Sequence, residues 1–121
     1  MSHQSSFIWI TAERELLHQY PDAPESVSFL KQSHRHLFKF KVHIEVFDDD
    51  RDIEFILFKR FVDDSLDTFN MNVGAMSCEM ISDTLWHMIS GEYNNRKIKI
   101  EVSEDGENGS FKEYLARGDT K

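Results

Sequence analysis

The sequence predicts an α+β fold in which a four-stranded antiparallel sheet carries two helices on one face, in the order ββααββ. Three observations lead to this prediction. Apolar and charged residues alternate with a period of two over residues 34–46 and again over 97–104, as in half-buried strands. From Ile53 onward the apolar spacing changes to three and four, which indicates amphipathic helices. Strands and helices that come in separate blocks favour an α+β arrangement.

The first half of the chain is predicted to contain two strands joined by a loop. Residues 7–12, "FIWITA", are rich in aromatic and β-branched side chains and form the first strand. Residues 19–28 contain both prolines and several polar side chains, which is typical of a loop. The residues expected on the core face of the first strand share one parity: Phe7, Trp9, Thr11 and Glu13. In the second strand the core face begins with His34 and His36 and then becomes apolar.

The second half is predicted to hold both helices and two more strands. The acidic turn at 48–52 suits a helix start, because carboxylates are favourable at the N-terminal end of the helix dipole. Residues 70–76, "NMNVGAM", separate this helix from a second one, for which Ser77 is the expected N-cap. The strand at 97–104 follows, and after a turn a short last strand is expected at 110–116.

Composition limits the classes of function. The 121 residues suit one domain, expected to span 1–121 with residues 1–6 and 116–121 disordered. The net charge of −8 disfavours nucleic acid as a partner, because an acidic surface repels phosphates. The single cysteine, Cys78, excludes an intrachain disulfide. We see neither a signal peptide nor an apolar run of the ~20 residues that a membrane helix needs, so we expect a cytoplasmic protein without membrane contact.

The apolar faces of three predicted strands end in titratable groups. The second strand begins with His34 and His36, the strand 97–104 ends in Glu104, and the first strand ends in Glu13. Because an unpaired charge is costly to bury, such groups are expected at the rim of a core, where they pair or bind a ligand. Two histidines at i and i+2 on a strand lie roughly 7 Å apart and can share one zinc ion with a third ligand. Two half-buried, hydrogen-bonded histidines are the alternative.

Six short motifs, in order, resemble the 6-pyruvoyl-tetrahydropterin synthase and 6-carboxytetrahydropterin synthase family, whose architecture is the tunnelling fold (T-fold). "FIWITAEREL" resembles the family's F-x-F-x-A-A-H-R-L, with Glu13 in place of the first zinc histidine, and "HRHLF" resembles H-G-H-x-[YF]. "EFILFKR" resembles D-F-x-x-L-K, and "LDTFNMN" resembles L-D-H-x-x-L-N, keeping Asp67. "MSCEMIS" resembles P-T-x-E-N-L-A, keeping Glu79, and "IEVSE" resembles V-x-V-x-E, ending in Glu104.

The resemblance implies a zinc site and a pterin-type or purine-type ligand. It places zinc on His34, His36 and Glu13, a set of two histidines and a glutamate that is known in catalytic zinc sites. His18 is an alternative third ligand, and an ion pair between Glu13 and a protonated histidine is the metal-free alternative. Glu104 is expected to anchor the ligand ring, as the family's glutamate does. Glu79 is expected to touch the ligand.

The sequence departs from the family at its catalytic base. The family has a cysteine about four residues before H-G-H, where this chain has Leu30, and Thr68 replaces the histidine that relays protons. Asp67 remains as a weak catalytic candidate, and Cys78 matches no catalytic position. We therefore expect a divergent member that binds a ligand at a zinc-containing pocket between subunits. The alternative is an active zinc-dependent carbon-oxygen lyase on 7,8-dihydroneopterin triphosphate. By resemblance, a homo-oligomer, a hexamer or tetramer, is expected.

Overall fold

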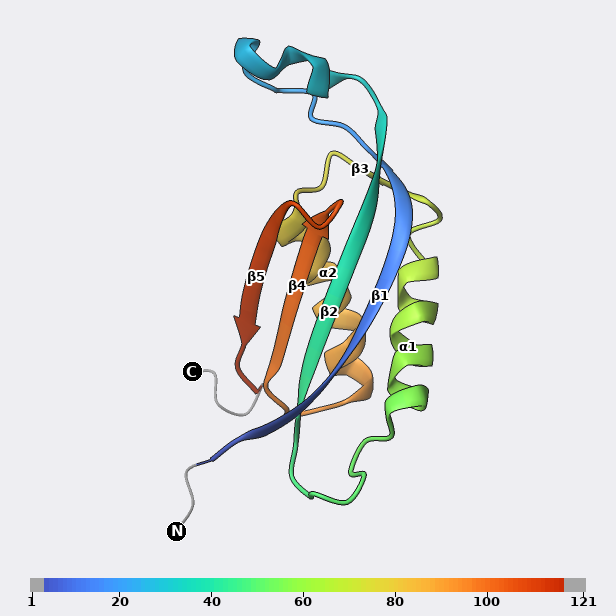
Figure 1. Ribbon diagram of the computed structural model, residues 1–121, viewed down its shortest axis with the longest axis vertical. Helices are drawn as coiled ribbons and strands as arrows, with labels where there is room; N and C mark the ends of the chain where they lie inside the picture. The colour runs from blue at the N-terminus through green and yellow to red at the C-terminus, as the bar shows by residue number, and fades with distance from the viewer. Residues whose placement is uncertain (1–3, 117–121) are drawn as a thin grey trace.

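The computed structural model describes residues 4–116 as a twisted sheet with helices packed against one of its faces (Figure 1). The strands run in the spatial order β3-β1-β2-β4-β5. The elements in chain order are β1 (Ser6–His18), the 3₁₀ helix η1 (Glu25–Lys31), β2 (His34–Val46), α1 (Phe55–Asp67), β3 (Asn72–Gly74), α2 (Cys78–Glu92), β4 (Ile98–Glu104) and β5 (Asn108–Tyr114). The predicted α+β class is confirmed.

The sheet has five strands and is mixed, so the predicted four-stranded antiparallel sheet was wrong. β1, β2, β4 and β5 pair antiparallel, whereas the short strand β3 runs parallel to the end of β1. β3 lies in the segment that separates the two helices. It pairs through long-range backbone bonds, with the N–H of Leu17 donating to the carbonyl of Met71 and that of Gln19 to Gly74. Such a pairing leaves no periodic signal in three residues.

Both predicted helices are present, and each begins at a side chain that accepts from the helix backbone. Glu54 caps α1 by accepting from the N–H groups of Ile56 and Leu57. Ser77 caps α2 by accepting from the N–H of Met80, as the sequence predicts. The two helices lie side by side on one face of the sheet (Figure 1). The buried core between the helices and the sheet includes Phe38, Phe40, Phe58, Leu85 and Ile100.

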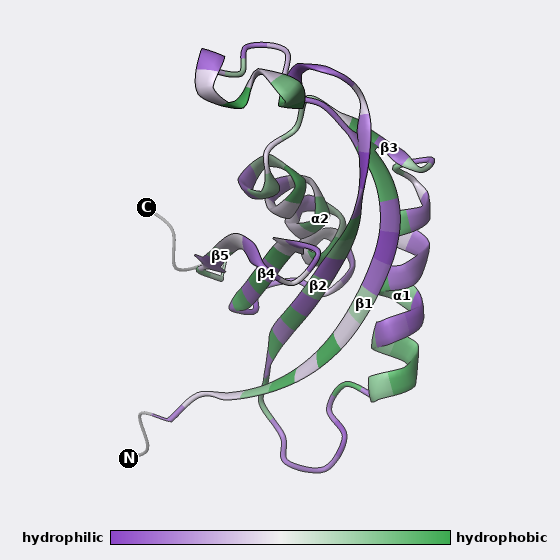
Figure 2. Cartoon of the chain, turned by 45° about the horizontal axis from the view of Figure 1, so that its top comes forward, coloured by the Kyte–Doolittle hydropathy of each residue, from purple (hydrophilic) through white to green (hydrophobic). Residues whose placement is uncertain are grey.

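The core face of β1 is the opposite of the one that the sequence analysis chose. Ile10, Ala12 and Leu16 are buried, whereas Trp9 is 53% exposed on the uncovered face. Lys41 Nζ lies 4.3 Å from the centre of the Trp9 ring, so this aromatic residue is covered by a cation instead of by the core. The alternation of polar and apolar residues along β1 and β2 is visible in Figure 2. Glu13 shares its parity with Trp9 and therefore lies on the uncovered face.

The predicted loop after β1 contains η1 and closes on itself. The N–H of Tyr20 donates to the carbonyl of Leu30 at 2.8 Å, which brings the two ends of the loop together. The loop lies at the same end of the sheet as the turn between β4 and β5 (Figure 1). Ser6 begins β1, and Ala116 is buried. Residues 1–3 and 117–121 lie outside the described residues.

Within residues 4–116, no helix combines the length and the apolar character that crossing a membrane requires.

Candidate metal centre

Three histidines from two neighbouring strands meet at the end of the core face. In the antiparallel pairing of β1 with β2, His18 lies directly opposite His34, and Leu16 lies opposite His36. Because side chains alternate between faces, the even-numbered histidines point to the same side as the buried residues of both strands. One ring nitrogen of each histidine lies within 4.8 Å of the other two. The register of one hairpin therefore assembles the cluster.

The other ring nitrogen of each histidine faces a group that only accepts hydrogen bonds. His18 Nε2 lies 2.9 Å from the carbonyl oxygen of Met76, and His34 Nδ1 lies 2.7 Å from that of Gln32. His36 Nδ1 lies 2.8 Å from the Asp105 carboxylate. Each of these nitrogens must carry the proton and donate. In the neutral ring the remaining nitrogen then has a free lone pair.

The inner nitrogens have the properties of metal ligands. His18 Nδ1 and His34 Nε2 are buried and have no hydrogen-bond partner within residues 4–116. Burial lowers the pKa of His18, although the Glu104 carboxylate opposes this shift. Neutral imidazoles whose outer nitrogens are held by carbonyls or carboxylates are the usual arrangement around zinc. The donor set thus fits a divalent metal ion, which would satisfy lone pairs that are costly to leave unpaired.

Glu104 lies beside the three histidines. One carboxylate oxygen is 3.7 Å from His18 Nδ1, and the other is 4.0 Å from His36 Nε2. The pairing of Glu104 with Phe38 across β2 and β4 brings it to this end of the sheet. The amide of Asn108 donates to the carboxylate at 3.3 Å, which restrains it from the other strand of the hairpin. Its negative charge is well placed to favour a cation among the histidines.

A cavity of about 520 Å³ adjoins the cluster. Its lining comes from the three histidines, Glu104, the loop after β1 and the start of α2, where Cys78, Glu79 and Met80 lie. Tyr20 and Leu30 add an aromatic and an apolar wall. Such a combination of apolar walls with a few polar groups is typical of sites for small molecules.

Cys78 belongs to this cavity although the sequence analysis assigned it no site. Burial raises the pKa of its thiol to about 11, and the carboxylates of Glu104 and Glu79 act in the same direction. The thiol is therefore protonated at neutral pH and is a poor nucleophile in the metal-free protein.

The structure brings together most, but not all, of the predicted site residues. His34, His36, Glu104 and Glu79 line one cavity, and His18, the alternative third ligand, completes the histidine cluster. Glu13 does not join them, because it faces the uncovered side of the sheet and lines a different cavity. Extending the first strand by six residues reaches His18, but this residue joins the histidines only because the even-numbered face of β1 is the buried one, opposite to the face that the sequence analysis chose.

Asp67 also lies elsewhere. Its carboxylate accepts from the guanidinium of Arg14 at 3.1 Å and is 67% exposed on α1. Arg35, which replaces the family's glycine, pairs with Glu15 at 2.9 Å on the uncovered face. Neither contact reaches the histidine cavity, so Asp67, the catalytic candidate of the sequence analysis, does not line it.

No family model and no curated protein matches the chain.

Proposed function

We propose that this protein binds zinc through His18, His34 and His36 and holds a pterin-type or purine-type ligand in the adjoining cavity. The observation that carries the proposal is the set of three inward lone pairs, two of which are buried without a partner. Bound zinc would supply a Lewis acid that polarises an oxygen of the ligand. An imidazole that binds zinc contributes no charge, so Glu104, beside the cluster, would compensate part of the positive charge of the metal.

Glu104 and Glu79 are the groups proposed to recognise the ligand. A pterin or guanine ring presents an amine and a ring N–H side by side, and a carboxylate accepts both. Glu104 lies at the boundary between the histidines and the cavity, which suits a ligand whose ring meets the carboxylate while its substituent meets the metal. Tyr20 and Leu30 offer the flat apolar surface that such a ring requires.

The T-fold family remains a proposal that rests on the motifs and on the layout of strands and helices. Two further features distinguish this chain from the family's enzymes and favour binding over catalysis. The only thiol in the cavity is on α2 and is protonated at neutral pH. Thr68, at the position of the relay histidine, donates to the carbonyl of Ser65 at 2.6 Å. These features support a ligand-binding role in which the family's base and relay are missing.

The alternative function is that of a zinc-dependent lyase on 7,8-dihydroneopterin triphosphate. The observation in its favour is that Cys78 lines the same cavity as the histidines, so a thiol is present, although at a different place in the chain. Zinc-loaded protein that releases triphosphate from this substrate, and a Cys78→Ala variant that does not, would establish the lyase. Absence of triphosphate release would leave binding as the function.

We also propose that the protein is a cytoplasmic homo-oligomer, a hexamer or tetramer, that binds neither nucleic acid nor membrane. Strand β5 has no partner on its outer side within residues 4–116, which offers an edge for association. Light scattering coupled to size-exclusion chromatography measures the assembly, and a stable monomer would contradict this part of the proposal.

The proposed function is tested by metal content and ligand titration together. Elemental analysis of purified protein should find zinc near one equivalent per chain, and much less in His34→Ala. Calorimetric titration of zinc-loaded protein with guanine and with neopterin should show binding that Glu104→Ala weakens by about 10-fold to 100-fold, as expected for a lost charged hydrogen-bonding partner. Glu107→Gln is a matched control, because it removes a carboxylate from the same hairpin but outside the cavity. Equal affinity in Glu104→Ala and wild type would rule out the anchor role.

A further inference from the structure

Asp105 holds one histidine of the cluster and the turn beside Glu104 at the same time. Its Oδ2 lies 2.8 Å from His36 Nδ1, while its Oδ1 accepts from the N–H of Leu37 at 2.9 Å. Its own N–H donates to the carbonyl of Leu37 at 2.8 Å. Three hydrogen bonds therefore tie this residue to the start of β2. The resemblance to the T-fold family and the sequence patterns gave no role to this position.

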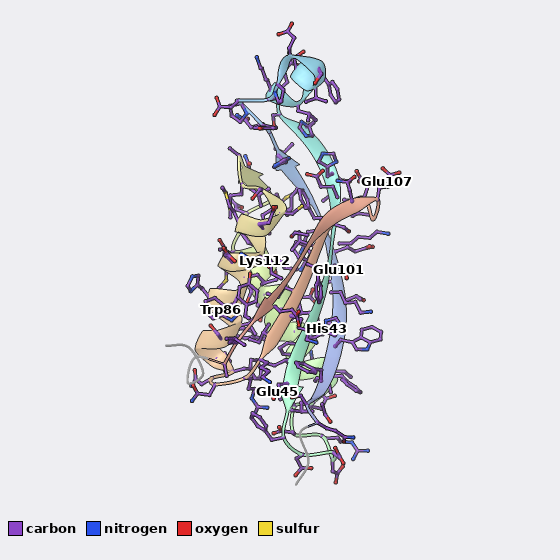
Figure 3. The ribbon with its side chains drawn as sticks, turned by 90° about the vertical axis from the view of Figure 1, so that its left-hand side faces the viewer. His43, Glu45, Trp86, Glu101, Glu107 and Lys112 are labelled. Carbon is purple, nitrogen blue, oxygen red and sulfur yellow. The ribbon has the colours of Figure 1, made fainter. Side chains whose placement is uncertain are left out.

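The geometry of the turn explains how a short side chain reaches both partners. β4 and β5 pair up to Glu104 and Asn108, which leaves three residues for the turn. Asp105 and Gly106 have φ angles of 58° and 73°, in the left-handed region that aspartate, asparagine and glycine tolerate best. This conformation turns the chain back over the start of β2, and Glu107 marks the tip of the hairpin (Figure 3).

The hydrogen bond to His36 determines which ring nitrogen is free. The carboxylate can only accept, so Nδ1 carries the proton and Nε2 keeps its lone pair. Nε2 is the nitrogen that lies 4.0 Å from Glu104. Among the outer partners of the three histidines, Asp105 is the only carboxylate, since His18 and His34 face backbone carbonyls. A carboxylate partner also makes the ring a more basic ligand.

We propose that Asp105 is a positioning residue that fixes His36 for metal binding and couples it to the turn that places Glu104. The proposal rests on the metal site proposed above, but it concerns a group that touches neither metal nor ligand. Glu104 precedes Asp105 in the chain, so the three bonds that anchor Asp105 also restrain the backbone of Glu104. Loss of Asp105 should then weaken metal binding directly and ligand binding through the displaced turn.

Substitution by asparagine separates positioning from fold. Asparagine tolerates the left-handed backbone of Asp105, so Asp105→Asn keeps the turn. It has one acceptor oxygen where aspartate has two, and Leu37 and His36 both donate. If the amide oxygen serves the Leu37 N–H, the amide NH₂ faces His36 and favours the tautomer whose Nε2 carries the proton. That tautomer cannot use Nε2 as a ligand.

The experiment combines zinc affinity with the tautomer of His36. Competition against a chromophoric chelator measures the affinity for zinc, and long-range ¹H–¹⁵N spectra of the metal-free protein report the protonated nitrogen of each histidine. We expect Asp105→Asn to bind zinc about 10-fold to 100-fold more weakly, the range found when partners of metal-ligating histidines are removed. The spectra should show Nδ1–H in wild-type His36 and loss of this state in the variant, with His18 and His34 unchanged.

Glu107→Gln is the control, because it removes one negative charge from the same hairpin without a contact to His36. Equal weakening by Glu107→Gln and Asp105→Asn would reduce the effect to net charge and overturn the proposal, as would wild-type affinity in Asp105→Asn. If the wild type binds no zinc, the proposed function fails, while the tautomer measurement still decides the role of Asp105. If Asp105→Asn does not fold, the wild-type spectrum decides alone, since Nε2–H in His36 would overturn the assignment.

Discussion

Zinc should stabilise the folded protein, and His34 should carry this effect. The perturbation is His34→Ala, which removes a buried ring nitrogen that has no partner in the metal-free protein. The unfolded chain does not hold the three histidines together, so a metal ion that binds them favours the folded state. The gain in the free energy of unfolding depends on the ratio of free zinc to the dissociation constant.

The magnitude follows from this linkage. At free zinc 100-fold above the dissociation constant, the free energy of unfolding rises by about 2.7 kcal/mol. For a domain of 121 residues this corresponds to a rise in Tm of roughly 8–16 °C. Removal of one of three ligands should weaken binding by at least ~100-fold, as much as the largest effects of outer partners. The remaining gain is then below about 0.4 kcal/mol, or roughly 2 °C.

Differential scanning fluorimetry measures the Tm of each variant in zinc and in chelator, and the difference between the two values is the zinc-dependent shift. His43→Ala is the matched control, because His43 lies on the same strand but faces the uncovered side. It should keep the full shift. In the chelator, His34→Ala should lose only about 1 kcal/mol, from the hydrogen bond to Gln32 and ring packing. An equal zinc-dependent shift in His34→Ala and wild type would refute the assignment.

Three further outcomes are expected. Phe38→Ala should lower the free energy of unfolding by about 3–5 kcal/mol in urea titrations, because this ring is fully buried beneath His18 and His36; a loss under about 1 kcal/mol would contradict that packing. Hydrogen bonds from Lys112 and Tyr114 lower the pKa of Asp83. The carboxylate therefore stabilises the fold above its unfolded pKa, and this contribution is lost as the pH falls through the folded pKa. Asp83→Asn should make Tm fall less steeply with decreasing pH in the acid range, and an unchanged slope would refute this. In metal-free protein, iodoacetamide at pH 8 should alkylate the Cys78 thiol on the order of 100-fold more slowly than a free cysteine, because burial raises the pKa of this thiol to about 11. Mass spectrometry follows the reaction. A rate equal to that of free cysteine would show that the thiol is unperturbed.

The sequence predicts the fold class and β2 well because the periodicity of β2 is local, whereas the first strand was expected over residues 7–12 and β1 spans Ser6–His18. In β2, thirteen alternating residues leave one reading, and the structure confirms it. In β1 both parities carry apolar residues, and the choice depended on whether Phe7 and Trp9 were counted as core. Both rings instead lie on the face of the sheet that carries no helices, where Lys99 packs over Phe7 and Lys41 over Trp9. Pairing with a neighbouring strand decides which face of β1 is buried, and a single sequence does not reveal that pairing.

The candidate site was predictable in part for the same reason. His34 and His36 follow from the pattern of β2, and Glu104 from that of β4. Choosing the wrong face of β1 led to Glu13, and the correct face leads to His18. The sequence pattern could not predict the role of Asp105, because its contact with His36 depends on the turn between β4 and β5, which are far from His36 in the chain. Cys78 likewise enters the cavity only through the packing of α2.

Because His18 lies directly opposite His34 in the pairing of β1 with β2, the loop between these strands should tolerate insertions better than β1 does. An added residue in the loop between them leaves the pairing of the strands unchanged and costs little, because the entropy of loop closure grows slowly with length. One residue added within β1 after Ile10 would place Ile10 on the face opposite to Ala12, Leu16 and His18, so one of these two groups would leave the core face. Variation in chain length among natural relatives should therefore collect between residues 19 and 33 and be absent from residues 10–18.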